Sequence, residues 1–198
     1  MDSESTTQIP RAKGVKVSVC SGSMSKNVEG IIQHIKHNMK DVVETVSYEP
    51  LPYNVSDMDK LDLSGIDVLL LCHSIENRRF SITNVTDALY DGFLQRAKNY
   101  LGQSKVGVIA HDFPEGDLSS EKLSSKMASF RYTQNTTFKC ASLVLIGGQL
   151  AEDPVQLTRT QRDDLRQFFC AAASQSCLEI IQVMLYRFRL FITCGHFT

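Results

Sequence analysis

The stretch that most constrains the fold is the run from Ile66 to Cys72, Ile-Asp-Val-Leu-Leu-Leu-Cys. It is nearly all apolar and has the length of one strand, which is typical of a strand covered on both faces. Such strands occur in parallel sheets flanked by helices, because parallel neighbours need long crossovers that are usually helical. The run therefore predicts the central strand of an α/β protein.

Extended and helical patterns alternate along the rest of the chain. We predict strands at 14–20, 42–48, 66–72, 105–111 and 141–146, helices at 28–39, 84–101, 119–131 and 158–181, and irregular connections at 49–63 and 73–83. Strands joined by helical crossovers predict a three-layer α/β/α sandwich. Its five-stranded parallel sheet should have the doubly wound order 2-1-3-4-5.

Length and composition fit one domain. The chain has 198 residues, of which 42% are hydrophobic, enough for one substantial core and too few for two average domains. We assign residues 14–182 to the domain, 1–13 to a disordered tail and 183–198 to a divergent C-terminal tail. The apolar stretch 183–194 is too short to span a bilayer, so we expect no membrane span.

Charge, targeting signals and cysteine spacing limit the partners, the location and the metal sites that we expect for this protein. The formal net charge is −1 and there is no long basic run, so nucleic acid is not an expected partner. The start of the chain lacks the apolar core of a signal peptide, which favours a cytoplasmic location. The six cysteines form no Cys-x-x-Cys pair, so we predict reduced thiols, no disulfide and no metal site. The sequence does not indicate an oligomeric state.

A short loop rich in hydroxyl groups joins the first predicted strand to the first helix. Ligands of doubly wound sheets bind at the carboxyl ends of the strands, near the switch point between strands one and three. A loop that enters a helix there presents unpaired amide groups, which attract phosphate. The candidate binding residues are Ser21, Gly22, Ser23, Met24, Ser25, Lys26 and Asn27.

The loop from Gly22 to Val28, Gly-Ser-Met-Ser-Lys-Asn-Val, resembles the FMN-phosphate loop of flavodoxins, whose pattern is Gly-Ser/Thr-x-Ser/Thr-Gly-Asn-Thr. The order of strands and helices in the predicted domain is also similar to that family. The resemblance implies a flavodoxin-like fold with FMN as its cofactor. It further implies electron transfer or flavin-dependent reduction, with a redox protein as a partner.

In flavodoxins, the loops after the third and fourth strands form the walls around the flavin ring. By position, those walls would be residues 73–82 and 112–117 here. The resemblance therefore adds five residues to the candidate site, with the two phenylalanines available to stack on the ring: His73, Ser74, Phe80, Asp112 and Phe113.

The departures from the flavodoxin pattern support an alternative. Lys26 stands where the family has Gly, Val28 replaces the final Thr, and the third-strand loop lacks the family's Gly- and Tyr-rich sequence. A fold of this kind supports many functions. The alternative is a flavodoxin-fold binding or regulatory module that has lost the flavin.

A second resemblance concerns the same loop. Cys20, followed by Lys26, is similar in spacing to the Cys-x5-Arg signature of low-molecular-weight protein tyrosine phosphatases, and Asp153-Pro154 is similar to their general-acid Asp-Pro. This implies phosphatase-like chemistry with Cys20 as the nucleophile, which requires a thiolate. Lys26, however, lacks the planar fork with which Arg holds a phosphoryl group.

Histidines and acidic residues at the same predicted edge leave two interpretations open. His73 and His111 end strands, so each is either a ligand-contacting acid or base or a hydrogen-bonded wall residue. Asp112, Glu115 and Asp117 make the fourth-strand loop acidic, which suits either docking to a basic partner or plain solvation.

Overall fold

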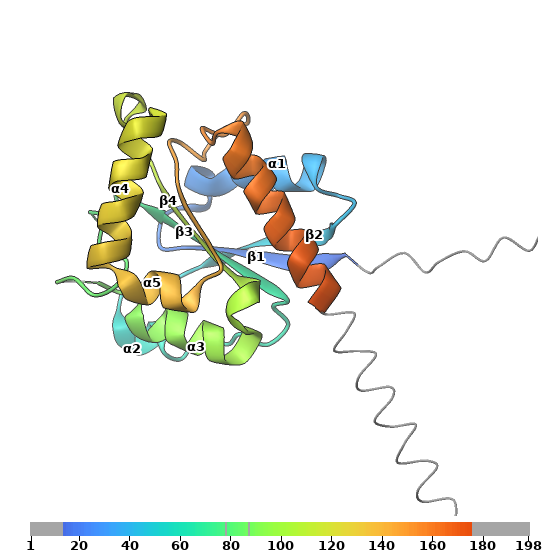
Figure 1. The fold of residues 1–198 in the computed structure, drawn as a ribbon. Coiled ribbons are helices and arrows are strands. Elements are labelled where there is room, and N and C mark those ends of the chain that lie inside the picture. The colour runs from blue at the N-terminus through green and yellow to red at the C-terminus, as the bar shows by residue number, and fades with distance from the viewer. Residues whose placement is uncertain (1–13, 78, 87, 176–198) are drawn as a thin grey trace, which may run out of the picture.

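The fold is built on a five-stranded sheet of order β2-β1-β3-β4-β5, in which every neighbouring pair is parallel. A computed structural model describes residues 14–77, 79–86 and 88–175. Its strands are β1 (Val15–Ser21), β2 (Val43–Pro50), β3 (Val68–Ser74), β4 (Val106–His111) and β5 (Leu143–Ile146). The predicted fold class is confirmed: the chain is an α/β/α sandwich with flavodoxin-like strand order (Figure 1).

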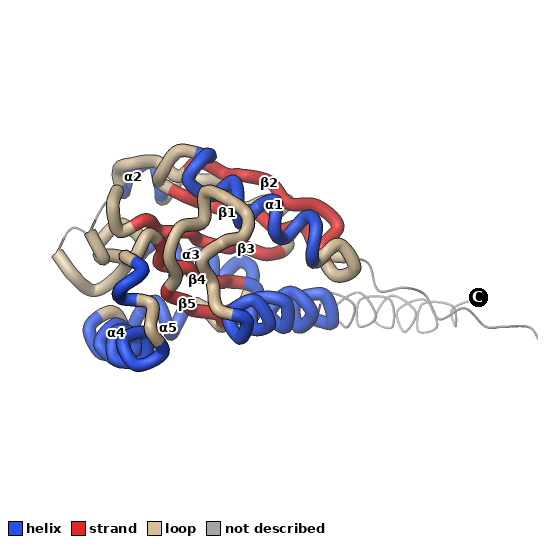
Figure 2. Tube along the Cα trace, turned by 90° about the horizontal axis from the view of Figure 1, so that it is seen from above, coloured by secondary structure: helices blue, strands red, loops and turns tan. Residues whose placement is uncertain are grey.

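Helices cover both faces of the sheet. One face carries α1 (Glu29–Asn38) and a helix over residues 159–175, whose apolar side chains share one core cluster. The opposite face carries α3 (Asp91–Leu101), α4 (Ser120–Thr133) and α5 (Asn135–Cys140). Shorter turns complete the chain: α2 (Val55–Met58), η1 (Ser25–Val28), η2 (Gln103–Lys105) and η3 (Glu115–Asp117). Viewed from above, the strands follow one another from β2 to β5 (Figure 2).

The central strand shows why the sheet lies between two helical layers. Val68, Leu70 and Cys72 face the cluster that contains α1, whereas Leu69 and Leu71 face the cluster that contains α3. Every residue of β3 is buried, which confirms the prediction drawn from the apolar run. Successive side chains of a strand point to opposite faces, so a strand in this position must be apolar throughout.

One predicted helix is wrong over its first half: among the described residues of the interval 84–101, a helix begins only at Asp91. Asn84 has a φ of +61°, in the left-handed region, and its amide donates to the Asp91 carboxylate. The amide of Ile82 donates to the Gln134 side chain, 2.8 Å away. Side chains of other segments satisfy this backbone, so it has no need of helical hydrogen bonds.

Two smaller differences bear on the site. β3 continues through His73 and Ser74, which we predicted in a loop, because Ser74 pairs in register with His111 of β4. α5, which we did not predict, follows α4 directly. The predicted tails 1–13 and 183–198 lie outside the described residues, as do residues 78 and 87.

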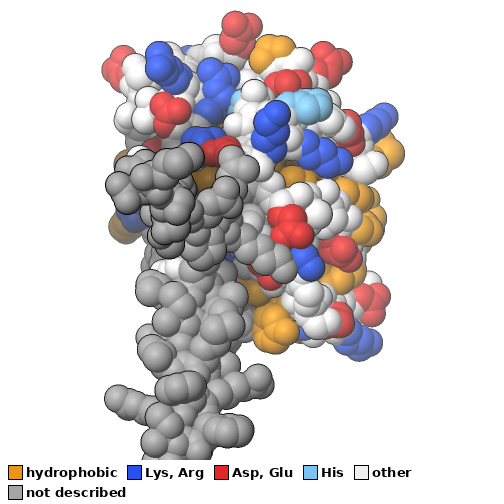
Figure 3. Space-filling view, turned by 90° about the vertical axis from the view of Figure 1, so that its right-hand side faces the viewer, with side chains coloured by type: hydrophobic (Ala, Val, Ile, Leu, Met, Phe, Trp, Pro, Cys, Tyr) orange, Lys and Arg blue, Asp and Glu red, His pale blue; other side chains and the backbone are white. Residues whose placement is uncertain are grey.

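The surface and the helices agree with the balanced composition. Figure 3 shows acidic and basic side chains interspersed over one face of the molecule. Within the described ranges, no helix combines the length and the apolar character needed to cross a membrane.

Candidate functional site

The β1–α1 loop lies at the carboxyl end of β1, between β2 and β3, where the order of the doubly wound sheet reverses. Ser21 is the last residue of β1, and Ser25, Lys26 and Asn27 form most of the turn η1. The loop therefore occupies the position at which a ligand of this fold would bind.

The first two serines of the loop bond to one another. The hydroxyls of Ser21 and Ser23 are 2.8 Å apart, and the amide of Ser23 donates to Ser21 Oγ at 3.2 Å. Both residues are buried. Their hydroxyls therefore stabilise the turn, and the exposed part of the loop begins at Met24.

Three residues absent from our candidate list close over this turn. Tyr48 Oη of β2 donates to the Ser23 carbonyl at 2.6 Å, and Asn77 Nδ2 donates to the Gly22 carbonyl at 3.0 Å. A Cβ atom at Gly22 would lie 3.2 Å from Tyr90 Oη, so glycine permits this close approach. Tyr48 lies near the carboxyl end of β2, a position that could have been considered from the sequence. Nothing in the spacing of Asn77 and Tyr90 indicated their contacts.

Hydrogen-bond donors remain open in the next part of the loop. No described residue accepts a hydrogen bond from the amides of Met24, Ser25 or Lys26, and all three residues are exposed. The start of α1 itself is covered, because the Gly30 amide donates to the Ala151 carbonyl at 2.9 Å. An anion would therefore meet the amides of η1 and not the end of α1.

The third-strand wall is held by its own hydrogen bonds. His73 is buried, with Nε2 2.8 Å from the Arg79 carbonyl and its ring edge-on to Tyr90. Ser74 Oγ donates to Asp112 Oδ2 at 2.5 Å. His73 is thus a hydrogen-bonded wall residue, and Ser74 joins the two predicted walls to one another.

Asp112 is the polar centre of the fourth-strand loop. It has a φ of +67°, and its Oδ2 lies 3.0 Å from Nδ1 of the fully buried His111. Partial burial raises the pKa of Asp112, but the interactions with His111 and Ser74 outweigh it and hold the pKa below its ordinary value. The carboxylate is therefore committed to these neighbours.

The two phenylalanines do not frame a slot for a flavin ring. The centroids of Phe80 and Phe113 are 5.2 Å apart and their planes are perpendicular. A flat ring between two others needs about 7 Å, because stacked carbon atoms approach to about 3.5 Å. Phe80 also packs on Phe130, with centroids 4.6 Å apart. The pair belongs to an aromatic cluster at the base of the loops.

The space beside the β1 loop is also small. The cavity between Gly22, His73, Asn77 and Tyr90 has a volume of about 10 Å³, which is room for roughly one water molecule. The residues that we predicted around the isoalloxazine ring therefore do not fit that ring in this arrangement.

Cys20 does not meet the requirements of a phosphatase nucleophile. Its side chain is fully buried, and burial, followed by interactions with Cys72 and Glu49, raises the pKa of its thiol. The thiol donates weakly to the Ser18 carbonyl at 3.6 Å. A neutral, inaccessible thiol cannot attack a phosphate ester.

Comparison with known proteins does not assign the chain to a family. No protein-family model matches the chain, and no curated protein matches it at a significant level. Within the described segments, no three or more His, Cys, Asp or Glu side chains are grouped so that they could hold a metal ion. The fold and the site together define an α/β/α sandwich of flavodoxin-like topology whose carboxyl edge is closed by side-chain contacts.

Proposed function

We propose that this chain is a flavodoxin-fold binding module without a flavin, and that its recognition surface is the loop cluster at the carboxyl edge. The observation that carries the proposal is the direct packing of Phe80 on Phe113, which leaves no gap between the two rings for a third. The hydrogen bonds of Tyr48 and Asn77 to the β1 loop support it, because they occupy the carbonyls of Ser23 and Gly22.

The open part of this surface suits an anionic group. The amides of Met24, Ser25 and Lys26 are exposed donors with no acceptor among the described residues. Consecutive donors of this kind bind phosphate or carboxylate oxygens, and the ammonium group of Lys26 adds a positive point charge. A phosphate or carboxylate on a ligand or partner is the chemistry that this loop would recognise.

A second candidate is FMN-dependent electron transfer, with a redox protein as partner. The same exposed amides favour it, because FMN ends in a phosphate group. It requires Phe80 and Phe113 to separate from 5.2 Å to about 7 Å, with the loss of their edge-to-face contact. Electron transfer would then depend on the flavin itself, positioned by the loops.

Titration of the isotope-labelled full chain with inorganic phosphate and with FMN separates these candidates. The proposal predicts that both ligands shift the amide resonances of Met24 to Lys26, that flavin fluorescence stays unquenched, and that FMN is lost on desalting. Lys26→Glu should abolish the shifts, whereas Lys36→Glu, an equal charge change in the last turn of α1, should not. Retention of FMN with quenched fluorescence would establish the second candidate. No shift with phosphate would refute anion recognition.

A further inference from the structure

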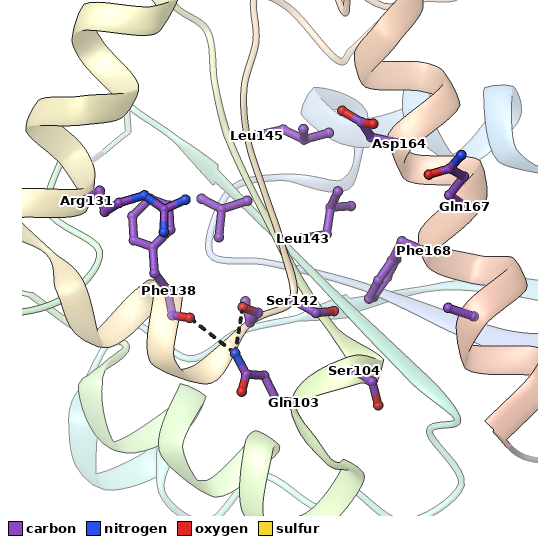
Figure 4. Close-up of a pocket in the computed structure, with 13 residues that line it drawn as sticks. Gln103, Ser104, Arg131, Phe138, Ser142, Leu143, Leu145, Asp164, Gln167 and Phe168 are labelled. Atoms are coloured by element: carbon purple, nitrogen blue, oxygen red, sulfur yellow. Dashed lines mark hydrogen bonds between the residues drawn. The ribbon is translucent and has the colours of Figure 1, made fainter.

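The edge strand β5 forms the floor of a groove that includes none of the residues described at the carboxyl edge. The groove has a volume of about 630 Å³ and lies between α5 and α4 on one side and the helix over residues 159–175 on the other. Arg131 and Phe138 line the first wall, and Asp164 and Phe168 line the second (Figure 4). Its floor is the side of β5 that faces away from β4.

The backbone of β5 presents free hydrogen-bonding groups to this groove. The Gly147 amide donates to the Ala110 carbonyl of β4, and bonding groups alternate along a strand, so Leu143 and Leu145 also face β4. The backbone groups of Val144 and Ile146 must then point away from β4. Val144 lines the groove, whereas Ile146 is fully buried. The Ile146 carbonyl supports this assignment, because it accepts a hydrogen bond from Gln161 at 2.7 Å, outside the sheet.

Val144 is the residue with both groups available. No described residue bonds to its N–H or C=O from the groove side. Unpaired groups on an edge strand are a template for another strand. An extended peptide could pair with Val144 through two hydrogen bonds.

The walls carry one charge of each sign. The Arg131 guanidinium lies over the Phe138 ring at 4.3 Å, and it has no acidic partner among the described residues. Asp164 is exposed on the opposite wall and has no basic partner among those residues. These two charges are therefore available to a bound segment.

We propose that an extended peptide segment of another protein binds in this groove as an additional strand beside β5, placing an acidic side chain toward Arg131 and a basic one toward Asp164. Side chains of a strand alternate between the two faces, so the two charges must be an odd number of residues apart. Apolar residues beside them would pack on Phe138 and Phe168.

Charge complementarity favours such a partner over a second copy of this chain. If two copies paired antiparallel through β5, the two-fold axis would run perpendicular to the joined sheet. The same face of each copy would then lie on the same side of that sheet. Both Arg131 side chains would then lie on one face and both Asp164 side chains on the other. Neither charge would gain an opposite partner.

Two synthetic peptides test the proposal on the full chain. In acetyl-Thr-Val-Lys-Glu-Val-Thr-Val-amide the charges face opposite sides of a strand, and in acetyl-Thr-Val-Lys-Val-Glu-Thr-Val-amide they share one side. The first should bind about tenfold more tightly, a difference accessible to one well-placed charge pair. On binding, the amide of Val144 should gain protection from hydrogen exchange, whereas those of Leu143 and Leu145 should not change.

Charge reversal supplies the specificity control. Arg131→Glu should lose the preference for the first peptide and prefer one with Lys at both charged positions. Asp164→Lys should prefer one with Glu at both positions. Arg159→Glu, an equal charge change on an exposed residue of the same helix as Asp164, should leave the preference intact.

Several outcomes would overturn the proposal. Equal binding of the two peptides, or unchanged protection of the Val144 amide on binding, would do so directly. Protection of the Val144 amide in the free protein that decreases on dilution would mean that a second copy occupies the groove. The same protection without dependence on concentration would mean that another part of this chain occupies it.

Discussion

The carboxyl edge and the open side of β5 differ in how their polar backbone groups are satisfied. At the carboxyl edge, Tyr48 and Asn77 reach the carbonyls of Ser23 and Gly22, and the remaining cavity is about 10 Å³. Along β5, no described residue bonds to the N–H or C=O of Val144 from the side of the groove, which has a volume of about 630 Å³. At the edge where this fold usually binds ligands, the space between the loops is thus closed and only the amides of η1 stay open, so side chains, and not topology, decide which surface is free.

The largest expected effect tests the aromatic closure of the carboxyl edge. Phe113→Ala should lower the free energy of unfolding by about 3 kcal/mol, because Phe113 is buried against Phe80. Phe138→Ala, in the half-buried wall of the groove, should cost less than half as much. Urea denaturation of both variants measures the difference. Equal losses would mean that the two regions are packed alike.

A second prediction concerns the bond that joins the two walls of the carboxyl edge. Ser74→Ala should cost about 2 kcal/mol at neutral pH, because it removes a buried hydrogen bond to a carboxylate. The folded-state pKa of Asp112 is below its ordinary value of 3.8, so its interactions stabilise the fold above that pH. This stabilisation is lost as the pH falls through the folded-state pKa.

Denaturation of wild type and Ser74→Ala across that range provides the measurement. The difference between the two proteins should shrink as the pH falls below 3.8. A difference that stays constant into acid would show that Asp112 does not carry the effect.

A smaller effect is expected at the cap over the β1 loop. Tyr48→Phe should cost about 1 kcal/mol, since it removes one hydrogen bond, the one to the Ser23 carbonyl. Tyr132→Phe is the matched control, because that side chain is 87% exposed. Thermal unfolding compares them. A stable Tyr48→Phe variant would argue that the loop is closed by packing alone.

The smallest effects should come from the charged walls of the groove. Arg131→Ala and Asp164→Ala should each change stability by no more than about 0.5 kcal/mol, because neither charge has an ion-pair partner among the described residues. Denaturation midpoints provide the check. A loss above about 1 kcal/mol for either variant would show that its side chain maintains the fold and is not available for binding.

The sequence predicted the architecture because its signals there are local. The run from Ile66 to Cys72 and the alternation of helical and extended patterns were enough to predict the sheet and its order. The helix predicted from Asn84 failed because Gln134, distant in the sequence, satisfies the backbone before it. Local periodicity carries no information about such a contact.

The positions of the candidate loops could be predicted from the sequence, but the packing of their side chains could not. The sequence located the loop after β1 and identified Phe80 and Phe113 as the aromatic residues of the walls. Whether two such rings frame a gap or pack together depends on their rotamers and on the path of the loops. The closing contacts of Tyr48, Asn77 and Tyr90 join segments far apart in the chain, and no spacing rule indicates them.

The most direct test of the closed carboxyl edge is a set of aromatic NOE spectra of phenylalanine-labelled protein, recorded with and without FMN. The account predicts cross-peaks between the rings of Phe80 and Phe113, and between those of Phe80 and Phe130, that are unchanged by FMN. Loss of the Phe80–Phe113 cross-peaks on addition of FMN, with new contacts from both rings to the flavin, would contradict it.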